Sequence, residues 1–537
     1  MKYISSKLHF EVYFWSLVIF AVSINWSHSM TVIMTVCLGI IWLAQPEYKS
    51  NVLKVFKNPS IILFSSLFFM TLISLPFTKH ISVSLKYVVS VLPVFLLSLF
   101  IGTSKKIPNE RFALLMYLYV LSTVLSSIFN IIHYLTNYSN LADIRYISFF
   151  MSHIRYSLFI NVSIFACFYY LFIYNISSTY IRVYLYFSLI WLTLFLFILQ
   201  SITGIIIAFI VFTFIISYKI YKSKNRTLRI GLSTILLFIF SLITWDLLSI
   251  IHEFTNVKTV DTSKIDKYTP YGNKYEFNEK IRIVENGNYV FDYYSEKEMH
   301  ETWDSVSSFH YDGLDKQNHF IKHTLIRYLA SKNLRKDKNG ILALSVHDRL
   351  NIENGIPNFK HENRFSFNYR IYQIIWEIDA YLNGFDPSGH SVTQRFEFWR
   401  CAVRLISDHY IVGVGTGNVR ELLDSYYEKV GTQLLIGKRL YPHNQYLTII
   451  ISFGFCGLTI FLLGLIVSVR YEKKARNYFV LVYLAILLLS MLNEDTFETQ
   501  YGIIFYAFWG ALFIFGQENK QSIETIDSES MTSSLVE

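Results

Sequence analysis

The sequence predicts an all-α polytopic membrane protein of about twelve transmembrane helices that carries one large mixed α/β subdomain in an external loop. Three observations support this fold class. Hydrophobic residues make up 53% of the 537 residues and aromatic residues 18%, an apolar share above that of soluble domains. Long apolar runs recur along the chain. Lys and Arg gather in some of the short segments between these runs.

The apolar runs define the predicted transmembrane helices. A helix needs about 20 mostly apolar residues to cross a bilayer. The first run follows the basic start of the chain and has no small-residue cleavage motif before Trp26, so it is expected to remain as the first helix. The twelve runs lie near residues 10–26, 29–45, 60–77, 85–102, 111–134, 155–175, 181–199, 201–219, 229–251, 443–469, 477–493 and 499–516.

The basic residues predict which side of the membrane each loop occupies. Lys and Arg collect in cytoplasmic loops, and a cytoplasmic N-terminus places every strongly basic loop on that side. The same count places both termini in the cytoplasm and the acidic turn at 493–498 outside. The basic loops contain Lys49, Lys54 and Lys57; Lys105, Lys106 and Arg111; Lys219, Lys222, Lys224, Arg226 and Arg229; and Arg470, Lys473, Lys474 and Arg476.

This topology divides the chain into four parts. Residues 1–251 form transmembrane helices 1–9, and residues 443–516 form helices 10–12. Residues 252–442 are too long for a linker and are expected to fold as an external subdomain. Residues 517–537 form a polar cytoplasmic tail.

The external segment contains strand and helix patterns of its own. Residues 281–284 and 289–294 flank Asn286-Gly287, which favours a β-hairpin because Asn-Gly accepts the positive φ of a tight turn. Two amphipathic helices follow, each with apolar residues at helical spacing. Their predicted buried faces consist of Ile321, Leu325, Tyr328 and Leu329, and of Ile371, Ile374, Ile375, Ile378 and Leu382.

The cysteines exclude a disulfide framework and a Cys-x-x-Cys metal site. Cys37, Cys167 and Cys456 lie in apolar runs, and Cys401 lies in the long polar segment. No metal and no cofactor is expected.

A histidine at the end of the external segment is the first candidate for chemistry. The chain reads Tyr441-Pro442-His443-Asn444 where it re-enters the membrane, and Gly454 and Gly457 follow after nine further residues. An imidazole at the external mouth of a helix can transfer protons where a lipid headgroup and a water-soluble molecule meet. An interfacial histidine that only hydrogen-bonds a loop is the alternative.

The pattern around His443 resembles a known family. Upstream, Arg395 and Trp399 form an Arg-x-x-x-Trp pattern, and Gly413-Val414-Gly415 follows. Together with His-Asn, nine residues and Gly-x-x-Gly, this stretch of about 390–460 resembles the O-antigen ligase and polymerase family of membrane glycan transferases, which includes O-oligosaccharyltransferases. The glycines lack a βαβ unit around them, which favours a tight turn over a nucleotide site.

The resemblance implies a function and a set of partners. The implied reaction is a metal-independent, inverting transfer of a glycan from undecaprenyl diphosphate to a hydroxyl, with lipid A core or another glycan or protein as acceptor. It would occur at the periplasmic face of the bacterial inner membrane, with contacts to membrane lipids and none to nucleic acid. The segment from Thr269 to Asn358 also resembles the long-loop members found in Bacteroidetes.

The same resemblance implies roles for single residues. Arg395 would hold the diphosphate through its forked donors, and His443 would take the hydroxyl proton. Beside the resemblance, the residues themselves suggest two substrate-binding positions. Asn444 would bind substrate or fix the tautomer of His443, and Trp399, one helical turn from Arg395, would stack on a sugar. A surface ion pair for Arg395 and core packing for Trp399 are the alternatives.

One position departs from the family pattern. Members usually carry a second Arg near the external end of the helix before the large loop, where this chain has Ile202 in Ser201-Ile202-Thr203-Gly204. The nearest substitute is Arg155, which lies two residues after His153 at the external start of another helix. Both are expected to bind substrate, with snorkelling at the interface as the alternative.

The acidic turn adds a carboxylate candidate. Glu494, and after it Asp495, would orient His443 or bind an acceptor, or would only be solvated in a loop. Glu494 is the first choice of the two.

Other functions remain open from the sequence. Within the enzyme class, an O-antigen ligase is favoured over a polymerase or a protein O-oligosaccharyltransferase. A lipid-glycan transporter would also have twelve helices, but it would carry charged residues inside its spans, which here are nearly free of charge. A sensory protein with an external ligand-binding domain is the third class.

Overall fold

The computed structural model describes residues 6–45, 48–137, 147–174, 176–257, 266–276, 283–362 and 367–518. Ile281, at the start of the predicted hairpin, and residues 519–537 of the predicted tail lie outside these ranges. The chain divides into two compact units. The first contains Met1–Thr136, Arg145–Ile215 and Arg395–Glu537, and the second consists mainly of Ile216–Gln394.

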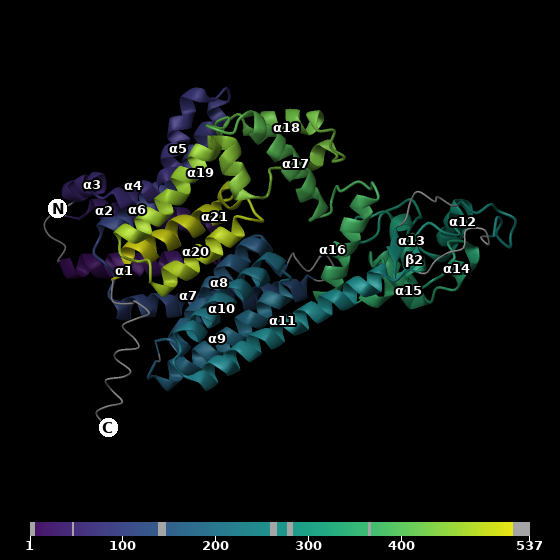
Figure 1. Cartoon of the computed structure of the whole chain (residues 1–537), viewed down its shortest axis with the longest axis horizontal. Coiled ribbons are helices and arrows are strands. Elements are labelled where there is room, and N and C mark those ends of the chain that lie inside the picture. The colour runs from purple at the N-terminus through teal and green to yellow at the C-terminus, as the bar shows by residue number, and fades with distance from the viewer. Residues whose placement is uncertain are drawn as a thin grey trace. The chain divides into compact units, whose positions relative to one another are not determined.

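The first unit is built from helices that pack side by side (Figure 1). Helix α19 packs along α4 and α5, α8 along α9, and α1 along α2 and α7. The last segment of the unit turns into π-helix at Phe505–Trp509 and Leu512–Gly516. The helices are α1 Ser6–Ser23, α2 His28–Leu43, α3 Tyr48–Lys57, α4 Pro59–Phe64, α5 Ser66–Ser74, α6 Ile81–Thr103, α7 Asn109–Thr136, α8 His153–Phe172, α9 Thr179–Ile198, α10 Ile202–Lys222, α17 Thr393–Asp408, α18 Val419–Lys429, α19 Gln445–Tyr471, α20 Tyr478–Ser490 and α21 Gln500–Ile504.

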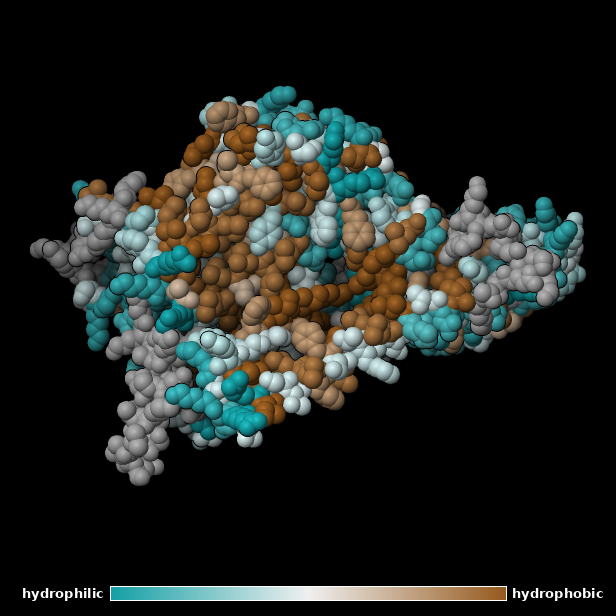
Figure 2. Space-filling view, viewed as in Figure 1, coloured by the Kyte–Doolittle hydropathy of each residue, from teal (hydrophilic) through white to brown (hydrophobic). Residues whose placement is uncertain are grey.

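The apolar helices agree with a multi-pass membrane protein. Within the described residues, seven helices are long and apolar enough to cross a bilayer, namely α6 to α11 and α19. The other predicted spans coincide with α1 and with shorter apolar helices such as α2 and α20. The visible face of the helical part is largely apolar in Figure 2. Twelve crossings and the sidedness of the loops stay predictions.

The end of the first unit near residue 472 joins several segments that the sequence assigns to the cytoplasm. Glu472, just after α19, accepts hydrogen bonds from Asn58 and Ser60 and forms an ion pair with Lys106 at 3.5 Å. Lys474 Nζ donates to the carbonyl of Gln517 at 2.8 Å. Segments at three of the four predicted basic loops therefore meet at the C-terminal end of α19, whereas His443 lies just before its N-terminal end.

The second unit contains the long helix α11 and the mixed α/β part of the chain (Figure 1). Ile250 and Phe254 at the end of α11 belong to the same hydrophobic core as Trp303, Tyr328 and Trp376. The unit holds α11 Arg226–Thr255, β1 Val284–Glu285, β2 Asn288–Tyr289, α12 Glu296–Val306, α13 Ile321–Ser331, α14 Lys338–Leu342, α15 Val346–Glu353 and α16 Phe367–Leu382.

The predicted hairpin is present but short. Strands β1 and β2 pair antiparallel, with Val284 opposite Tyr289 and Glu285 opposite Asn288. The two turn residues, Asn286 and Gly287, have φ values of 48° and 77°. Both are positive, as a type I′ turn requires, so the Asn-Gly signal located the turn correctly.

The two predicted helix faces differ in outcome. On α13, Ile321, Leu325, Tyr328 and Leu329 are all fully buried, as predicted. On α16 the predicted face is partly wrong, because Leu382 is 77% exposed. Tyr372, Trp376 and Ala380 are buried in the core, and Ile371 and Ile375 of the predicted face pack against it while partly buried. Aromatic and small residues therefore supply the most buried part of this face, which a pattern of aliphatic repeats does not reveal.

Candidate active site

His443 lies at the start of α19 in a constrained backbone conformation. Its φ is 49°, in the left-handed region that few residues other than glycine adopt. Asn444 is the N-cap of α19, and its side chain accepts from the backbone N–H of Leu447 at 3.1 Å. The Asn444 amide also donates to the carbonyl of Leu492 at 2.9 Å. Asn444 therefore fixes the turn that carries His443, while its expected contact with substrate stays a prediction.

The segment before His443 is held by side chains from α17 and α18. Arg420, Tyr427 and Trp399 donate to the carbonyls of residues 439, 440 and 442 at 2.9, 2.7 and 3.0 Å. The indole N–H of Trp399 thus supports the backbone beside His443. Stacking of Trp399 on a sugar stays a prediction.

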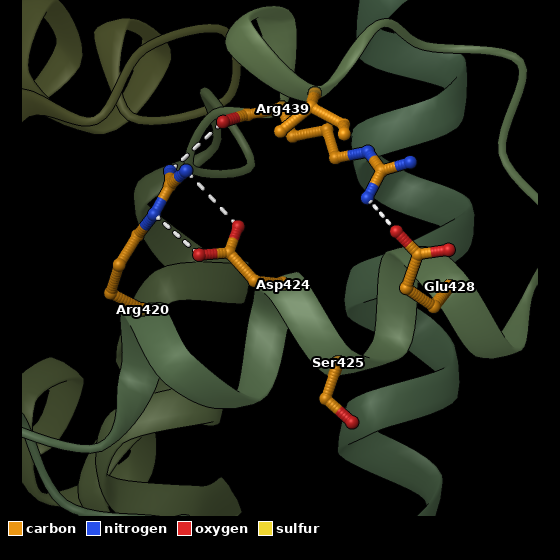
Figure 3. A pocket seen from close by; sticks show the side chains of 6 residues that line it. Arg420, Asp424, Ser425, Glu428 and Arg439 are labelled. Atoms are coloured by element: carbon orange, nitrogen blue, oxygen red, sulfur yellow. Dashed lines mark hydrogen bonds and ion pairs between the residues drawn. The ribbon is translucent and has the colours of Figure 1, made fainter.

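A pocket of about 360 Å³ lies next to Arg420 and Arg439 (Figure 3). Arg420 pairs with Asp424 at 3.0 Å, and Arg439 pairs with Glu428. Each guanidinium at this pocket therefore already contacts a carboxylate. The lining residues are Arg420, Asp424, Ser425, Glu428, Ile436 and Arg439.

Two arginines from distant parts of the sequence meet at one carboxylate. Glu494 is 4% exposed in the turn between α20 and α21. Its Oε2 accepts from Arg155 Nη1 at 2.6 Å, and its Oε1 accepts from Arg395 Nη2 at 3.2 Å. Arg155 also donates to Thr499 Oγ1 at 3.0 Å and to the carbonyl of Asp495 at 3.3 Å. Neither arginine is a solvated surface residue, since their side chains are only 8% and 16% exposed.

Asp495 connects the same turn to His443. Its Oδ2 accepts from the backbone N–H of His443 at 2.7 Å, and its Oδ1 accepts from Thr448 Oγ1 at 2.6 Å. His443 Nδ1 lies 3.8 Å from Asp495 Oδ2 and 3.9 Å from Glu494 Oε2. Burial raises the pKa of the Asp495 carboxyl, and hydrogen bonds from Thr448 and the charge of His443 oppose that rise.

The position where the family pattern expects a second arginine lies beside α8. Ser201 donates to Ser157 at 3.0 Å, and Asn161 of α8 donates to the carbonyl of Gly204 at 3.0 Å. Asn493, which precedes Glu494, donates to Thr203 at 2.9 Å. The start of α10 therefore lies close to both the helix of Arg155 and the acidic turn. His153 is the first residue of α8, and its contact with substrate stays a prediction.

The glycines of the motif make a close backbone contact. Gly454 interrupts α19 with a φ of 68°, and Gly413 has a φ of 69°. The amides of Val414 and Gly415 donate to the carbonyls of residues 451 and 452 at 2.8 and 2.9 Å, and Phe455 N–H donates to the carbonyl of residue 410 at 2.8 Å. We call this backbone contact between residues 410–415 and 451–456 the glycine clasp. It joins the chain after α17 to the helix that follows His443.

A third carboxylate of the turn provides a stability prediction. Burial and the nearby charge of Asp495 raise the pKa of Glu498 to about 8, against a partly compensating hydrogen bond from Tyr87. The folded protein therefore holds a proton that the unfolded chain releases near its ordinary value of 4.5. The Glu498 contribution to stability is fully present below about pH 4.5 and is lost as the pH rises through about 8. We expect Glu498→Gln to reduce the fall in Tm between pH 6 and pH 9, measured on purified protein. An unchanged fall would contradict this assignment.

The fold and the site together define a class. The described residues form a mostly helical, multi-pass membrane protein, and one end of its first unit brings together two arginines, two buried carboxylates and a partly exposed histidine.

The family follows from a direct comparison. A family model described as O-antigen ligase matches residues 340–462, which include Arg395, His443 and Gly454. A search of curated proteins finds no match. The predicted resemblance is confirmed over this region, which is similar to the O-antigen ligase family and indicates a glycosyltransferase-like enzyme.

The sequence favours Glu494 over Asp495, and both carboxylates lie near His443 in the structure. Asp495 also accepts a hydrogen bond from the His443 backbone, and the functional order of the two stays a prediction. Thr448, one helical turn into α19, is a further contact of Asp495 that the sequence does not indicate. The sequence feature that points to these contacts is the short acidic turn between two apolar runs. A carboxylate that is removed from water there is costly unless it is paired, so a partner is expected.

Proposed function

We propose that this protein transfers a glycan from undecaprenyl diphosphate to an acceptor hydroxyl, as an O-antigen ligase does, with lipid A core as the acceptor. The observation that carries the proposal is the meeting of Arg155, Arg395 and His443 at Glu494. These residues come from α8, α17 and the start of α19, and Arg155 is 339 positions from Glu494 in the sequence.

Each residue has a role that fits its chemistry. Arg155 and Arg395 bind the diphosphate, because guanidinium groups match phosphate oxygens in charge and geometry. Arg155 takes the place of the arginine that the family pattern expects at Ile202. Glu494 keeps both guanidiniums in position while the site holds no donor.

The reaction is a single displacement at the anomeric carbon. The acceptor hydroxyl oxygen forms the new bond to this carbon, its proton passes to His443, and undecaprenyl diphosphate leaves with the electron pair of the broken bond. The configuration inverts as a result. The diphosphate is a good leaving group, so charge stabilisation by the two arginines is the main requirement, and no metal is needed.

The location follows from the predicted topology. The site lies at the periplasmic face of the bacterial inner membrane, both termini lie in the cytoplasm, and residues 252–442 lie outside. The meeting of segments at three of the four predicted basic loops at the opposite end of α19 supports this sidedness.

The alternatives differ in what happens after donor binding. A polymerase would transfer to a growing glycan, and a protein O-oligosaccharyltransferase would transfer to Ser or Thr. A transporter would be expected to carry charged residues inside its spans, whereas the charged residues of this site lie at the ends of helices and in the turn between α20 and α21.

The test is complementation in the native host. Deletion of the gene is followed by expression of wild type, His443→Ala or Arg395→Ala, and surface glycans are compared with the lipid-linked pool on gels. We expect both variants to lower glycan transfer by at least about 100-fold, the range for loss of a general base or of a charge-stabilising group.

The outcomes separate the alternatives. Loss of long-chain lipopolysaccharide with polymer left on the lipid carrier identifies a ligase. Single-repeat material on the core identifies a polymerase, and loss of glycan from proteins identifies an O-oligosaccharyltransferase. Full rescue by both variants would refute the proposed chemistry. Glu428→Ala, which alters a surface ion pair on the same unit, serves as the control with expected full rescue.

A further inference from the structure

We propose that Asp495 is the positioning residue of His443, and that it directs the proton of the acceptor hydroxyl to His443 Nε2. This inference rests on the proposed function. It names the carboxylate that orients His443, the general base of that reaction. Two features of the site carry it, the backbone contact of Asp495 and the orientation of the imidazole.

The backbone contact fixes where His443 stands. Asp495 is 3% exposed and uses one oxygen for the N–H of His443 and the other for the hydroxyl of Thr448. A carboxylate held by two donors within one helical turn cannot rotate without breaking one of them. His443 has a left-handed φ of 49°, which is costly for a residue with a Cβ. The hydrogen bond to Asp495 compensates part of this cost.

The imidazole is oriented by the same carboxylates. Its Nδ1 is buried and, among the described residues, has no hydrogen-bond partner. The carboxylate oxygens of Asp495 and Glu494 lie 3.8 and 3.9 Å from it. The ring of Phe398 packs against the imidazole at 5.7 Å between centroids. Since Nδ1 faces the carboxylates, Nε2 is the nitrogen left for the acceptor, and the side chain is 33% exposed.

The two carboxylates have different tasks. Glu494 is engaged by Arg155 and Arg395, so its charge balances the guanidiniums. Within the described part of the chain, the carboxylate of Asp495 forms an ion pair with no side chain other than His443, although Arg155 donates to its backbone carbonyl. When Nε2 takes the hydroxyl proton, the imidazolium gains a positive charge, and Asp495 is the carboxylate free to stabilise it. A small rotation of the ring brings Nδ1–H within hydrogen-bond distance of Asp495 Oδ2.

The experiment separates chemistry from donor binding. Full-length variants are expressed in the deletion host, surface glycan is quantified, and the lipid-linked glycan that co-purifies with each protein is measured by mass spectrometry. The variants are Asp495→Asn, which keeps the shape but removes the charge, Asp495→Glu, which keeps the charge, and Thr448→Val, which removes one donor to Asp495 but leaves the carboxylate. His443→Ala and Arg395→Ala are the references.

The expected result is a split between the two readouts. Asp495→Asn should lower surface glycan by at least about tenfold, which is less than the loss expected when the base itself is removed. The amount of lipid-linked donor that co-purifies should equal that of His443→Ala. Arg395→Ala should lose the donor. Asp495→Glu should restore part of the transfer. Thr448→Val should lower transfer, but by less than Asp495→Asn does, because the carboxylate keeps its hydrogen bond from the His443 N–H.

Other results would overturn the inference. Transfer at the wild-type level in Asp495→Asn would contradict it. Loss of both donor binding and transfer in Asp495→Glu would also contradict it. If Asp495→Asn does not fold, Asp495→Glu carries the test, since reduced transfer with retained donor is still expected. Wild-type transfer in His443→Ala would refute the proposed function instead, which keeps the two failures distinct.

Discussion

Replacement of Glu494 with alanine is expected to lower the free energy of unfolding by about 3–5 kcal/mol, the cost of removing one partner from a buried ion pair. The variant leaves Arg155 and Arg395, with side chains 8% and 16% exposed, facing each other without the carboxylate that joins them. Two buried cations then repel one another and lack a counter-ion. The loss is larger than for either arginine alone, because Glu494 serves both.

The measurement is thermal and denaturant unfolding of the purified protein, with Glu428→Ala as the matched control. Glu428 also pairs with an arginine, but its side chain is 68% exposed, so its removal is expected to cost less than about 1 kcal/mol. Addition of inorganic diphosphate provides a second check. Diphosphate should partly restore the Tm of Glu494→Ala, because an anion can occupy the place of the lost carboxylate. Equal stability of Glu494→Ala and Glu428→Ala would contradict the buried pairing.

The membrane character of the fold was predictable because it depends on local composition. A helix such as α11 is apolar and largely exposed, as expected of a helix that faces lipid, and its Trp245 and Leu248 are 77% and 58% exposed. The apolar run in the sequence therefore predicts the helix directly. The boundary between the two units was harder to predict from the sequence. Residues 395–442 belong to a long polar segment, yet Phe398 and Leu423 in this range pack against Ile450 of α19.

The site was predictable only in part. His443 and Arg395 lie in a motif with fixed spacing, and motif spacing can be recognised in one sequence. The partner of Arg155 could not be derived, because an ion pair across 339 positions depends on how α8 packs beside the acidic turn. The hydrogen bond of Asp495 to the His443 backbone could not be derived for a similar reason. Two adjacent carboxylates look alike in the sequence. Only the structure shows that Glu494 accepts from the two arginines and that Asp495 accepts from the His443 backbone.

The glycine clasp gives the second large expected effect. Gly454→Ala should destabilise the protein by at least about 3 kcal/mol, because two costs combine. A φ of 68° is strained for alanine, and a Cβ there would lie 2.0 Å from the backbone oxygen of Ile411. Backbone atoms cannot move aside as a flexible side chain can, so the clasp hydrogen bonds must break. Gly437→Ala is the control, since a Cβ at Gly437 meets nothing within 4 Å.

The glycine clasp also explains why Gly454→Ala is expected to lower glycan transfer as well as stability. It holds residues 410–415, which follow the helix of Arg395, against α19, which follows His443. Gly454→Ala should therefore lower both the Tm and surface glycan transfer, although it contacts no reacting group. Gly413→Ala acts on the same contact, with a Cβ 2.5 Å from the amide of Phe453. The double variant should then cost less than the sum of the two single changes, because the clasp can be lost only once. Additive losses in Tm would show that the two glycines act at separate contacts.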